Sequence, residues 1–501
     1  MQPTSLRTPS AAALLALLTL GSAQAKQYYV DCSRPDAGEG SQDKPWNSLQ
    51  QVNSPTFAPG DVIAFKAGTT CTGTLSPKGV GTADAAIRIT KYTTAGAADN
   101  NPNPIINGTG AAGAAVTLTN QDHWQISNLT VTNPASGLAA RQGIHVTASD
   151  GKTHTGITIE HNTVHHVAGQ TNKRTHSHDF ILSCGILVDT SGAGSRYDGV
   201  LVQHNAVSDC GGGGIKVRVG AADNLGHKAR VTRSTIHACG GDGIIISYSD
   251  SPLMDYNVAS DLGTGAYPFT GGNFAGMWVL GDHNPTISHN VVYGSTMSDI
   301  DSEAFDCDWG NTGNCTVEYN YSRANAGGAF LNCDGCGPPD APPGGADQIV
   351  RYNIFENDCR MYSNGRRPTL YFYQNVMYCP DEHKGFDIAV AHNAYFTNNI
   401  FVGNGKASLP ARSDIRWRWN VFYRVPRPTD NGIEADPGFV DPGSGGNDLA
   451  SVGGYKLRRG SPALGNGAVI PDSGGVDFFG NPVSFTQKPN RGAYNGPGIE
   501  L

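Results

Sequence analysis

The chain has 501 residues, a formal net charge of −8 and only 16% charged residues. A sparsely charged, slightly acidic chain offers no basic surface for nucleic acid or for an anionic membrane, so we expect neither as a partner. A membrane-spanning helix needs roughly 20 consecutive apolar residues, and no stretch of the chain approaches that length, so we expect no membrane span.

The N-terminal 25 residues have the pattern of a secretory signal peptide. They contain one arginine, Arg7, then the apolar run "AAALLALLTL" and the small-residue stretch "SAQA". This order predicts cleavage after Ala25 and a mature protein that is secreted or periplasmic. Eleven cysteines in an exported chain predict several disulfides and at least one unpaired thiol.

An asparagine-centred repeat runs through most of the chain. In segments such as "ITIEHNTVHHV", "PTISHNVVYGS" and "QIVRYNIFEND", apolar and polar residues alternate up to an asparagine, and a second short strand follows. Variable spacing between repeats favours a solenoid whose coils carry loops of different lengths over stacked helix pairs. The repeated asparagines are Asn162, Asn205, Asn257, Asn290, Asn320, Asn353, Asn375, Asn399 and Asn420, and Ser234 takes the equivalent place between the second and third.

A further strand recurs between consecutive asparagines, as in "GIHVTAS", "GILVDTS", "GIKVRVG", "GIIISYS", "GMWVLGD", "AFDCDWG" and "AFLNCDG". Each coil therefore carries at least two short parallel strands joined by a tight turn. Stacked coils would let the asparagine side chains hydrogen-bond to one another in a buried ladder. The predicted fold class is all-β, a single-stranded parallel β-solenoid.

On these repeats the chain resembles the right-handed parallel β-helix superfamily, which includes pectate lyases, alginate lyases and polygalacturonases. The resemblance covers residues 27–424, and "DPGFVDPG", "GSPALGNG" and "NRGAYN" look like the usual tail of such proteins. We therefore expect a signal peptide at 1–25, a β-helix domain at 26–424 and a C-terminal tail at 425–501. The tail is expected to lie as extended strands over the final coils and to cap the core, because an open end exposes unpaired strand edges.

The resemblance also implies where the site lies. In that superfamily the asparagine turn separates the second and third strands, so the "GIKV" strand is the first, and substrate grooves run along its outer face. Alternation then predicts that the inward positions are Ile144, Ile186, Ile215, Ile244, Met277, Phe305 and Phe330. It predicts that the outward positions are His145, Thr147, Leu187, Asp189, Lys216, Arg218, Ile245, Ser247, Trp278, Leu280, Asp306, Asp308, Leu331 and Cys333.

One end of this outer face is acidic. Asp306 and Asp308 lie in "IDSEAFDCDWG" two positions apart on one strand, so about 7 Å should separate them on the same face. Asp301 and Glu303 come from the preceding loop at the edge of the groove. The cluster predicts either a metal site or the acid groups of an enzyme.

The other end is basic and the middle is aromatic. Lys216 and Arg218 should lie three coils before the acids, on the order of 14 Å away at the usual strand spacing. Tyr248 and Trp278 lie between the two ends, where an exposed ring can stack on a sugar. Asp189, beside Arg218, would form a salt bridge or anchor a second metal position. Tyr248, Trp278 and Asp189 are the predicted substrate-binding residues.

The first of two competing chemistries is β-elimination on a uronic acid. In the lyases that the chain resembles, aspartate-bound calcium neutralises the substrate carboxylate and a lysine or arginine removes the C5 proton. Asp306, Asp308 and Glu303 offer hard oxygen ligands suited to Ca²⁺, and Lys216 or Arg218 would be the base. Three coils between base and metal is a long distance for one sugar to bridge. This reading nevertheless ranks first, because the resembled superfamily includes such lyases and because the basic residues suit an acidic polysaccharide.

The second chemistry is glycoside hydrolysis, which needs two carboxyl groups about 5 Å apart for retention or about 6.5 to 9.5 Å apart for inversion. Asp306 and Asp308, with Glu303 nearby, meet the inverting range. A third reading is a noncatalytic glycan-binding solenoid, which would keep Trp278 and need no clustered acids. The favoured expectation is a monomeric exported enzyme, a polysaccharide lyase before a hydrolase, that cleaves an extracellular polysaccharide.

Two other features are less specific. The loop "TNKRTHSHDF", with His176, His178 and Asp179, precedes a first strand and would close over the groove, bind a metal or simply remain polar. Cys210 and Cys239 fall at equivalent places on adjacent coils, which predicts a cross-coil disulfide or a stack of buried thiols.

Overall fold

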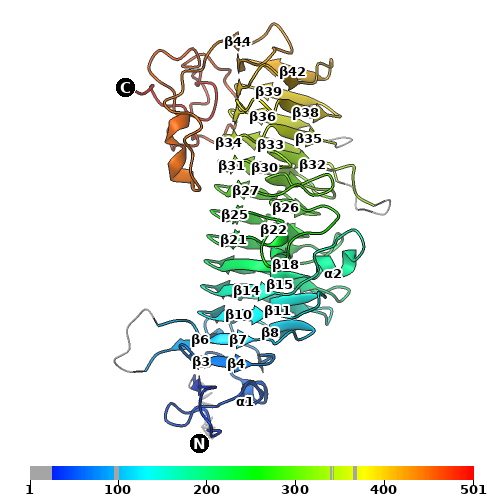
Figure 1. Ribbon diagram of the computed structural model, residues 1–501, viewed down its shortest axis with the longest axis vertical. Helices are drawn as coiled ribbons and strands as arrows, with labels where there is room; N and C mark the ends of the chain where they lie inside the picture. The colour runs from blue at the N-terminus through cyan, green and yellow to red at the C-terminus, as the bar shows by residue number, and fades with distance from the viewer. Residues whose placement is uncertain (1–24, 95–100, 339–340, 342–343, 365–368, 501) are drawn as a thin grey trace, which may run out of the picture.

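The computed structural model describes residues 25–94, 101–338, 341, 344–364 and 369–500. The described chain winds into a long solenoid whose coils stack from the N-terminal end to the C-terminal end (Figure 1). The predicted signal peptide lies outside the described residues except for Ala25. Within the described part, no helix is long and apolar enough to cross a membrane.

Three long parallel sheets run along the solenoid, and each coil contributes a strand to each sheet in turn. We name the first the groove sheet. Its strands are β8 (Gly113–Thr119), β11 (Arg141–Ala148), β15 (Cys184–Thr190), the C-terminal part of β18 (Ala206–Arg218), β22 (Gly240–Ser247), β26 (Met277–Leu280), β29 (Phe305–Cys307), β32 (Phe330–Asn332), β35 (Arg360–Ser363), β38 (Phe386–Val390) and β41 (Ala407–Ser408).

The second sheet precedes the asparagine turn. Its strands are β1 (Gln27–Val30), β3 (Val62–Lys66), β6 (Ile87–Tyr92), β9 (Trp124–Ser127), β13 (Ile157–Glu160), β17 (Leu201–Gln203), β20 (Arg230–Thr232), β24 (Leu253–Asp255), β27 (Thr286–Ser288), β30 (Asn314–Glu318), β33 (Asp347–Arg351), β36 (Leu370–Tyr373), β39 (Ala394–Thr397) and β42 (Ile415–Arg418).

The third sheet follows the asparagine turn. Its strands are β4 (Thr70–Thr72), β7 (Ile105–Asn107), β10 (Thr130–Asn133), β14 (Thr163–Val167), the N-terminal part of β18, β21 (Thr235–His237), β25 (Val258–Ser260), β28 (Val291–Tyr293), β31 (Tyr321–Arg323), β34 (Ile354–Glu356), β37 (Val376–Tyr378), β40 (Ile400–Val402), β43 (Val421–Tyr423) and β44 (Ile433–Glu434).

The remaining elements are short. Four strands form a small parallel sheet, β12 (Thr153–Thr155), β16 (Arg196–Asp198), β19 (Gly226–His227) and β23 (Ser249–Asp250), and β2 (Thr56–Phe57) pairs with β5 (Lys78–Gly79). The helices are α1 (Leu49–Asn53), α2 (Ser177–Ile181) and the 3-10 helix η1 (Leu449–Tyr455). These bounds confirm the predicted all-β parallel solenoid.

The predicted asparagine ladder is present and buried. Asn162 Nδ2 donates to Asn205 Oδ1 at 3.1 Å, and the same contact recurs between Asn399 and Asn420 at 3.0 Å. Ser234 continues the ladder, because its hydroxyl oxygen accepts from the backbone N–H of Asn205 at 3.2 Å. The residue before each asparagine adopts a left-handed conformation, as at His161 (φ 55°), which turns the chain sharply enough to place the amide inside.

The groove sheet has the predicted register. The inward row predicted from alternation pairs strand to strand and is fully buried. The outward row pairs in the same way, in the order His145, Leu187, Lys216, Ile245, Trp278, Asp306 and Leu331. Period-two alternation therefore predicted which face each side chain of this sheet occupies.

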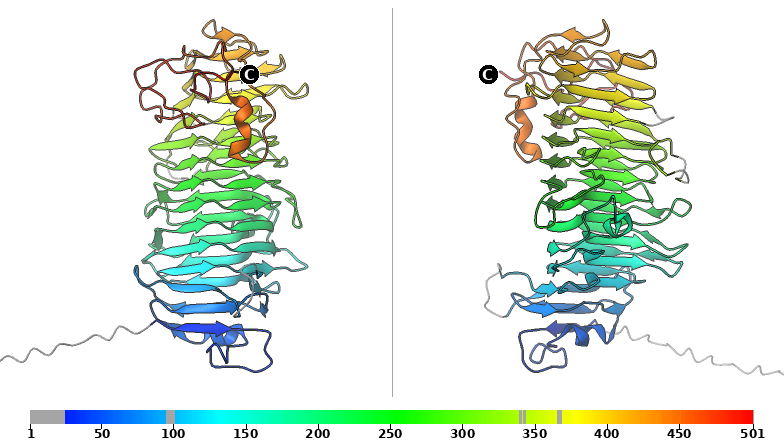
Figure 2. Two further views of the ribbon diagram at one scale, coloured as in Figure 1. Left: turned by 90° about the vertical axis from the view of Figure 1, so that its left-hand side faces the viewer. Right: turned by 45° about the vertical axis from the view of Figure 1, so that its right-hand side comes forward.

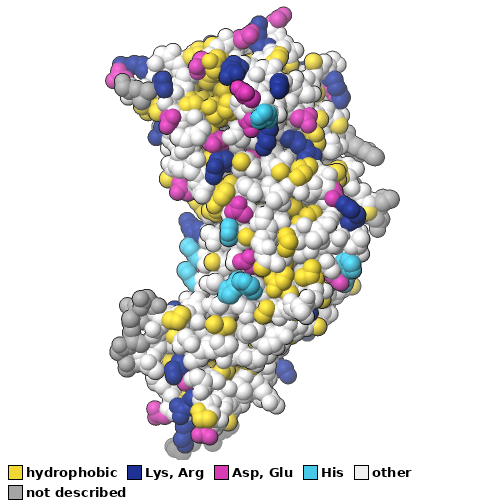
Figure 3. Space-filling view, viewed as in Figure 1, with side chains coloured by type: hydrophobic (Ala, Val, Ile, Leu, Met, Phe, Trp, Pro, Cys, Tyr) yellow, Lys and Arg dark blue, Asp and Glu magenta, His cyan; other side chains and the backbone are white. Residues whose placement is uncertain are grey.

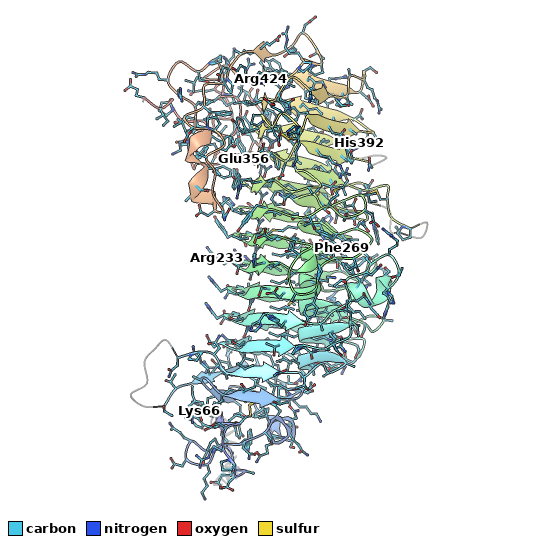
Figure 4. All side chains as sticks on the ribbon, in the orientation of Figure 1. Lys66, Arg233, Phe269, Glu356, His392 and Arg424 are labelled. Atoms are coloured by element: carbon cyan, nitrogen blue, oxygen red, sulfur yellow. A yellow bond between two sulfur atoms is a disulfide. The ribbon has the colours of Figure 1, made fainter. Side chains whose placement is uncertain are left out.

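The C-terminal segment lies along the flank of the later coils rather than as strands over the open end (Figure 2). After β44 it consists mainly of turns with η1. Tyr455 O–H donates to Glu356 Oε2 at 2.7 Å, and Figure 4 labels Glu356 beside this segment. The outer row of the third sheet explains the location, because it changes from exposed Ala206 and Thr235 to buried residues from Val291 onward, which the tail covers.

The cysteines divide as predicted into disulfides and unpaired thiols. The pairs are Cys32–Cys71, Cys307–Cys315, Cys333–Cys336 and Cys359–Cys379. Cys184, Cys210 and Cys239 are buried free thiols. Of the two structures predicted for Cys210 and Cys239, the stack of buried thiols is therefore present and the cross-coil disulfide is not.

Candidate functional site

The outer face of the groove sheet forms a groove of about 350 Å³ that extends from Asp189 on β15 to Trp309 after β29. Apolar side chains contribute most of its surface. The lining residues are Lys173, Phe180, Ile181, Leu182, Leu187, Asp189, Lys216, Val217, Arg218, Asp242, Ile245, Ser247, Tyr248, Trp278, Leu280, Asp308 and Trp309. Seven of the eight predicted site residues line it or belong to its outward rows. The exception is Glu303.

Asp308 lies at the acidic end and lines the groove. Its backbone N–H donates to Val279 O at 3.0 Å, which places Asp308 next to Leu280 in the same outward row of the groove sheet. Burial raises the pKa of Asp308 to about 7, and a hydrogen bond from the Trp309 N–H (2.8 Å) and the Lys173 cation oppose the rise. This carboxyl group is therefore protonated below neutral pH and can give up its proton near neutrality.

Asp306 is more buried than its position in the outward row suggested. It is only 5% exposed, and its Oδ1 has no hydrogen-bond partner among the described residues. Burial and the negative charge of Asp308 raise the pKa of Asp306 well above its usual range. The geometry favours a neutral, protonated Asp306.

Asp301 and Glu303 come from the loop that precedes β29, as predicted, but their surroundings differ. Asp301 is partly exposed and accepts a hydrogen bond from Asn273 Nδ2, and burial raises its pKa while Lys173 and Arg360 oppose that rise. Glu303 is fully buried away from the groove, 3.6 Å from the Arg360 guanidinium, and burial raises its pKa to about 8. Glu303 cannot contact a ligand without a rearrangement of the loop.

Residues 170–183 carry α2 (Figure 1) and line one side of the groove through Lys173 and residues 180–182. Two further loops, residues 263–276 and 294–304, pack against them. The loops join through the backbone bond from Lys173 N to Gly271 O (2.8 Å) and the ion pair of Arg174 with Asp299. Phe180 packs edge-on against Phe269, which Figure 4 labels, with ring centroids 5.9 Å apart. We call these segments the loop wall.

The loop wall confirms one reading of the histidine-containing loop. Residues Phe180, Ile181 and Leu182 line the groove, whereas His178 and Asp179 point to solvent with side chains 85% and 43% exposed. Across the described ranges, no group of three or more His, Cys, Asp or Glu side chains is arranged to hold a metal ion. Calcium binding by Asp306, Asp308 and Glu303 remains a prediction.

At the predicted basic end, Lys216 is buried and paired. It is 5% exposed, its Nζ lies 3.4 Å from Asp242 Oδ2, and it donates to the backbone oxygen of Phe180 at 2.9 Å. Burial lowers the pKa of Lys216, and Asp242 opposes that shift. An amine already committed to two acceptors differs from the free base that elimination requires.

The other predicted binding residues are distributed along the groove. Arg218 is exposed, with its guanidinium carbon 5.0 Å from the Tyr248 ring centroid. Burial opposes ionisation of Asp189, but the hydrogen bond from His145 Nε2 (2.9 Å) and the charge of His145, together with Thr147 and Arg218, lower the pKa of Asp189 overall. Trp278 is partly exposed at the centre.

Seven lining residues were not singled out by the sequence analysis: Lys173, Phe180, Ile181, Leu182, Val217, Asp242 and Trp309. Asp242 lies two positions before the inward residue Ile244, in the glycine-rich start of β22. Trp309 follows the acidic motif directly, and this adjacency was the available signal. Away from the groove, charges are scattered over the visible face without a large patch of one sign (Figure 3).

Comparison with known proteins defines the class. The family model "Right handed beta helix region" matches residues 112–268 and 221–414, which together span more than half of the 501 residues. The chain belongs to this right-handed β-helix family.

Individual relatives are more distant. The chain is 24% identical to the lacto-N-biosidase of Bifidobacterium longum subsp. longum, over 93% of this chain and 36% of that protein, so it spans about a third of the relative's length. The crystal structure of a GH136 lacto-N-biosidase from Eubacterium ramulus superposes with a TM-score of 0.55 at 20% identity, over 82% of this chain and 67% of that one. Pectate lyase Pel9A matches with a TM-score of 0.40 at 14% identity, over 95% and 97% of the two chains.

Proposed function

We propose that the protein is a glycoside hydrolase that binds a glycan in the groove, against Trp278, and cleaves it at the acidic end. The single observation that carries this proposal is Asp308, a groove-lining carboxyl group whose pKa burial raises to about 7. Such a group donates a proton to a leaving-group oxygen near neutral pH. The name of the lacto-N-biosidase relative supports the same reaction class.

Hydrolysis also needs a carboxylate that is ionised when the acid is protonated. Asp301 suits this role better than Asp306, because Asn273, Lys173 and Arg360 oppose the rise that burial causes in the pKa of Asp301, whereas three neighbouring carboxylates add to the rise in the pKa of Asp306. Its charge contributes to the raised pKa of Asp308, so the two groups interact. In the proposed reaction Asp308 protonates the glycosidic oxygen, Asp301 assists attack at the anomeric carbon, and water supplies the hydroxyl of the new reducing end.

This proposal reverses the order of the two enzymatic readings. Elimination was favoured because of the superfamily resemblance and because basic residues on the groove face, Lys216 or Arg218 as the base, suit an acidic polymer. Instead, the Lys216 amine is paired with Asp242 at 3.4 Å and lies three strands from Asp306 in the same row. A buried, paired amine at that distance cannot take a proton from a sugar bound at the acids.

The first substrates to test are oligosaccharides of the type that the relative's name denotes, followed by neutral and acidic polysaccharides. Four disulfides support action outside the cytoplasm, where such bonds persist. We propose an extracellular glycan as the partner.

Hydrolysis and elimination are distinguished by following reducing ends and ultraviolet absorbance together. New reducing ends without absorbance would support hydrolysis, and matched absorbance from unsaturated products would overturn the proposal. Substitutions Asp308→Asn and Asp301→Asn should each lower kcat by about a hundredfold or more. Full activity in either variant would contradict the role assigned to that residue, and activity lost in Asp306→Asn but kept in Asp301→Asn would exchange the roles of those two.

A further inference from the structure

A buried ion pair lies at the base of the groove, beneath the proposed sugar-binding surface. Lys216 Nζ and Asp242 Oδ2 are 3.4 Å apart, and the two side chains are 6% and 2% exposed. Both residues line the groove, but neither offers a free charge to a ligand. Burying two charges costs free energy, so the ion pair alone is weak evidence of a stabilising role. The other contacts of Lys216 and Asp242 indicate the role of the pair.

Lys216 connects the groove sheet to the loop wall. Besides its contact with Asp242, the amine donates to the backbone oxygen of Phe180 at 2.9 Å and lies 4.5 Å from the centroid of the Phe180 ring. Phe180 is the buried residue of α2, and the following residues Ile181 and Leu182 line the groove. The Lys216 side chain therefore joins the sheet to α2.

Asp242 connects the pair to the central aromatic residue. Its Oδ1 accepts a hydrogen bond from Trp278 Nε1 at 3.0 Å and a longer one from the backbone N–H of Ala275, at 3.4 Å, in the loop wall. The centroid of the Trp278 ring also lies 5.7 Å from Lys173 Nζ. Asp242 thus fixes the orientation of the indole relative to the wall.

We propose that Lys216 and Asp242 are positioning residues that hold Trp278 and α2 at a fixed separation and so set the width of the groove for its glycan. This inference rests on the proposed function for its activity readout, and it gives Lys216 a role other than that of a base. Lys216 and Asp242 act through Trp278 and Phe180 and do not touch the reacting atoms.

The ion pair predicts a specific pattern of substitutions. Removing one partner leaves the other charge buried and unpaired, whereas replacing both leaves a neutral site of similar shape. Lys216→Met keeps the apolar stem under Phe180, and Asp242→Asn keeps an oxygen acceptor for Trp278. A positioning pair should therefore tolerate the double substitution better than the single substitutions, whereas a catalytic base should not.

The experiment compares the full-length chain with K216M, D242N and the double variant. We expect each single variant to raise KM about tenfold with a smaller effect on kcat, and the double variant to return KM to within about threefold of the wild type. A double variant whose kcat is as low as that of K216M, at unchanged KM, would overturn the proposal and make Lys216 a catalytic residue. Where K216M does not fold, the comparison of D242N with the double variant provides the same test.

A second readout does not depend on hydrolysis. In each protein, the difference in fluorescence from its W278F counterpart isolates the emission of Trp278. This emission should shift in the two single variants and return to its wild-type value in the double variant. Unchanged Trp278 emission in all three variants would overturn the positioning role, even if the enzyme proved to cleave by another mechanism or not at all. The matched control is K152M, which removes an exposed lysine paired with Asp150 at 3.2 Å and should alter neither readout.

Discussion

Trp278 and Asp306 are direct neighbours in register on β26 and β29, so the central aromatic residue of the groove adjoins the acid cluster. Asp308 lies beside Leu280 in the other outward row and lines the same groove. A sugar stacked on the indole would therefore lie beside the carboxyl groups, which is the arrangement that cleavage requires.

The pKa of Asp308 predicts the alkaline side of the pH profile. A group with a pKa of about 7 loses its proton as pH rises through that value, so kcat/KM should fall above about pH 7. In Asp308→Asn, kcat should fall by about a hundredfold to ten-thousandfold, because the variant has no acid to donate. Rates measured across pH on one oligosaccharide provide the test.

Asp36→Asn is the control for that substitution, because Asp36 is exposed in the N-terminal region far along the solenoid from the groove. It should keep the wild-type profile. An alkaline limb that persists unchanged in a residually active Asp308→Asn would show that another group titrates there.

Trp278 should contribute to glycan binding through its partly exposed ring. We expect Trp278→Ala to raise KM about tenfold, equivalent to about 1.4 kcal/mol, with partial recovery in Trp278→Phe. Trp419, which is 38% exposed at the end of the second sheet, provides a matched control, and Trp419→Ala should leave KM unchanged. Equal KM values for wild type and Trp278→Ala would remove the indole from the binding site.

Sequence periodicity determined which parts of this site could be predicted. Alternation and the asparagine turns determine strand register, so the rows containing Lys216, Trp278 and Asp306 were predicted correctly. Periodicity carries no information on what a long loop covers. Phe180, which follows no repeat, covers Lys216, and the predicted exposed base is consequently a buried ion-pair partner.

The same limit applies to the acids. Strand spacing placed Asp306 and Asp308 on one face but could not show that Asp306 is 5% exposed while Asp308 lines the groove. Glu303 was grouped with them because it is close in sequence. Its carboxyl group instead turns toward Arg360, a residue of β35 two strands further along the groove sheet.

Chelation separates the proposed mechanism from the calcium-dependent alternative. The proposed reaction uses only carboxyl groups of the chain, so we expect activity to be unchanged by EDTA and by added calcium. A loss of cleavage in EDTA that calcium alone restores would return Asp306, Asp308 and Glu303 to the role of metal ligands. A calcium-dependent reference lyase, assayed in parallel, verifies that the chelator is effective.

The asparagine ladder predicts a stability change that is separate from the site. Asn353 is fully buried, and its Nδ2 donates to Val317 O at 2.9 Å and to Asn375 Oδ1 at 3.0 Å. Its Oδ1 accepts from the backbone N–H of Asn320 at 2.9 Å.

In Asn353→Ala these partners stay buried without their hydrogen bonds, which costs about 1–3 kcal/mol for each unsatisfied group, so the melting temperature should fall. Asn353→Ser should lose less, because Ser234 shows that a hydroxyl oxygen can accept the ladder bond, at 3.2 Å from the Asn205 nitrogen. Thermal melting of both variants tests this order, and equal losses would show that the ladder stabilises the solenoid through packing rather than through hydrogen bonds.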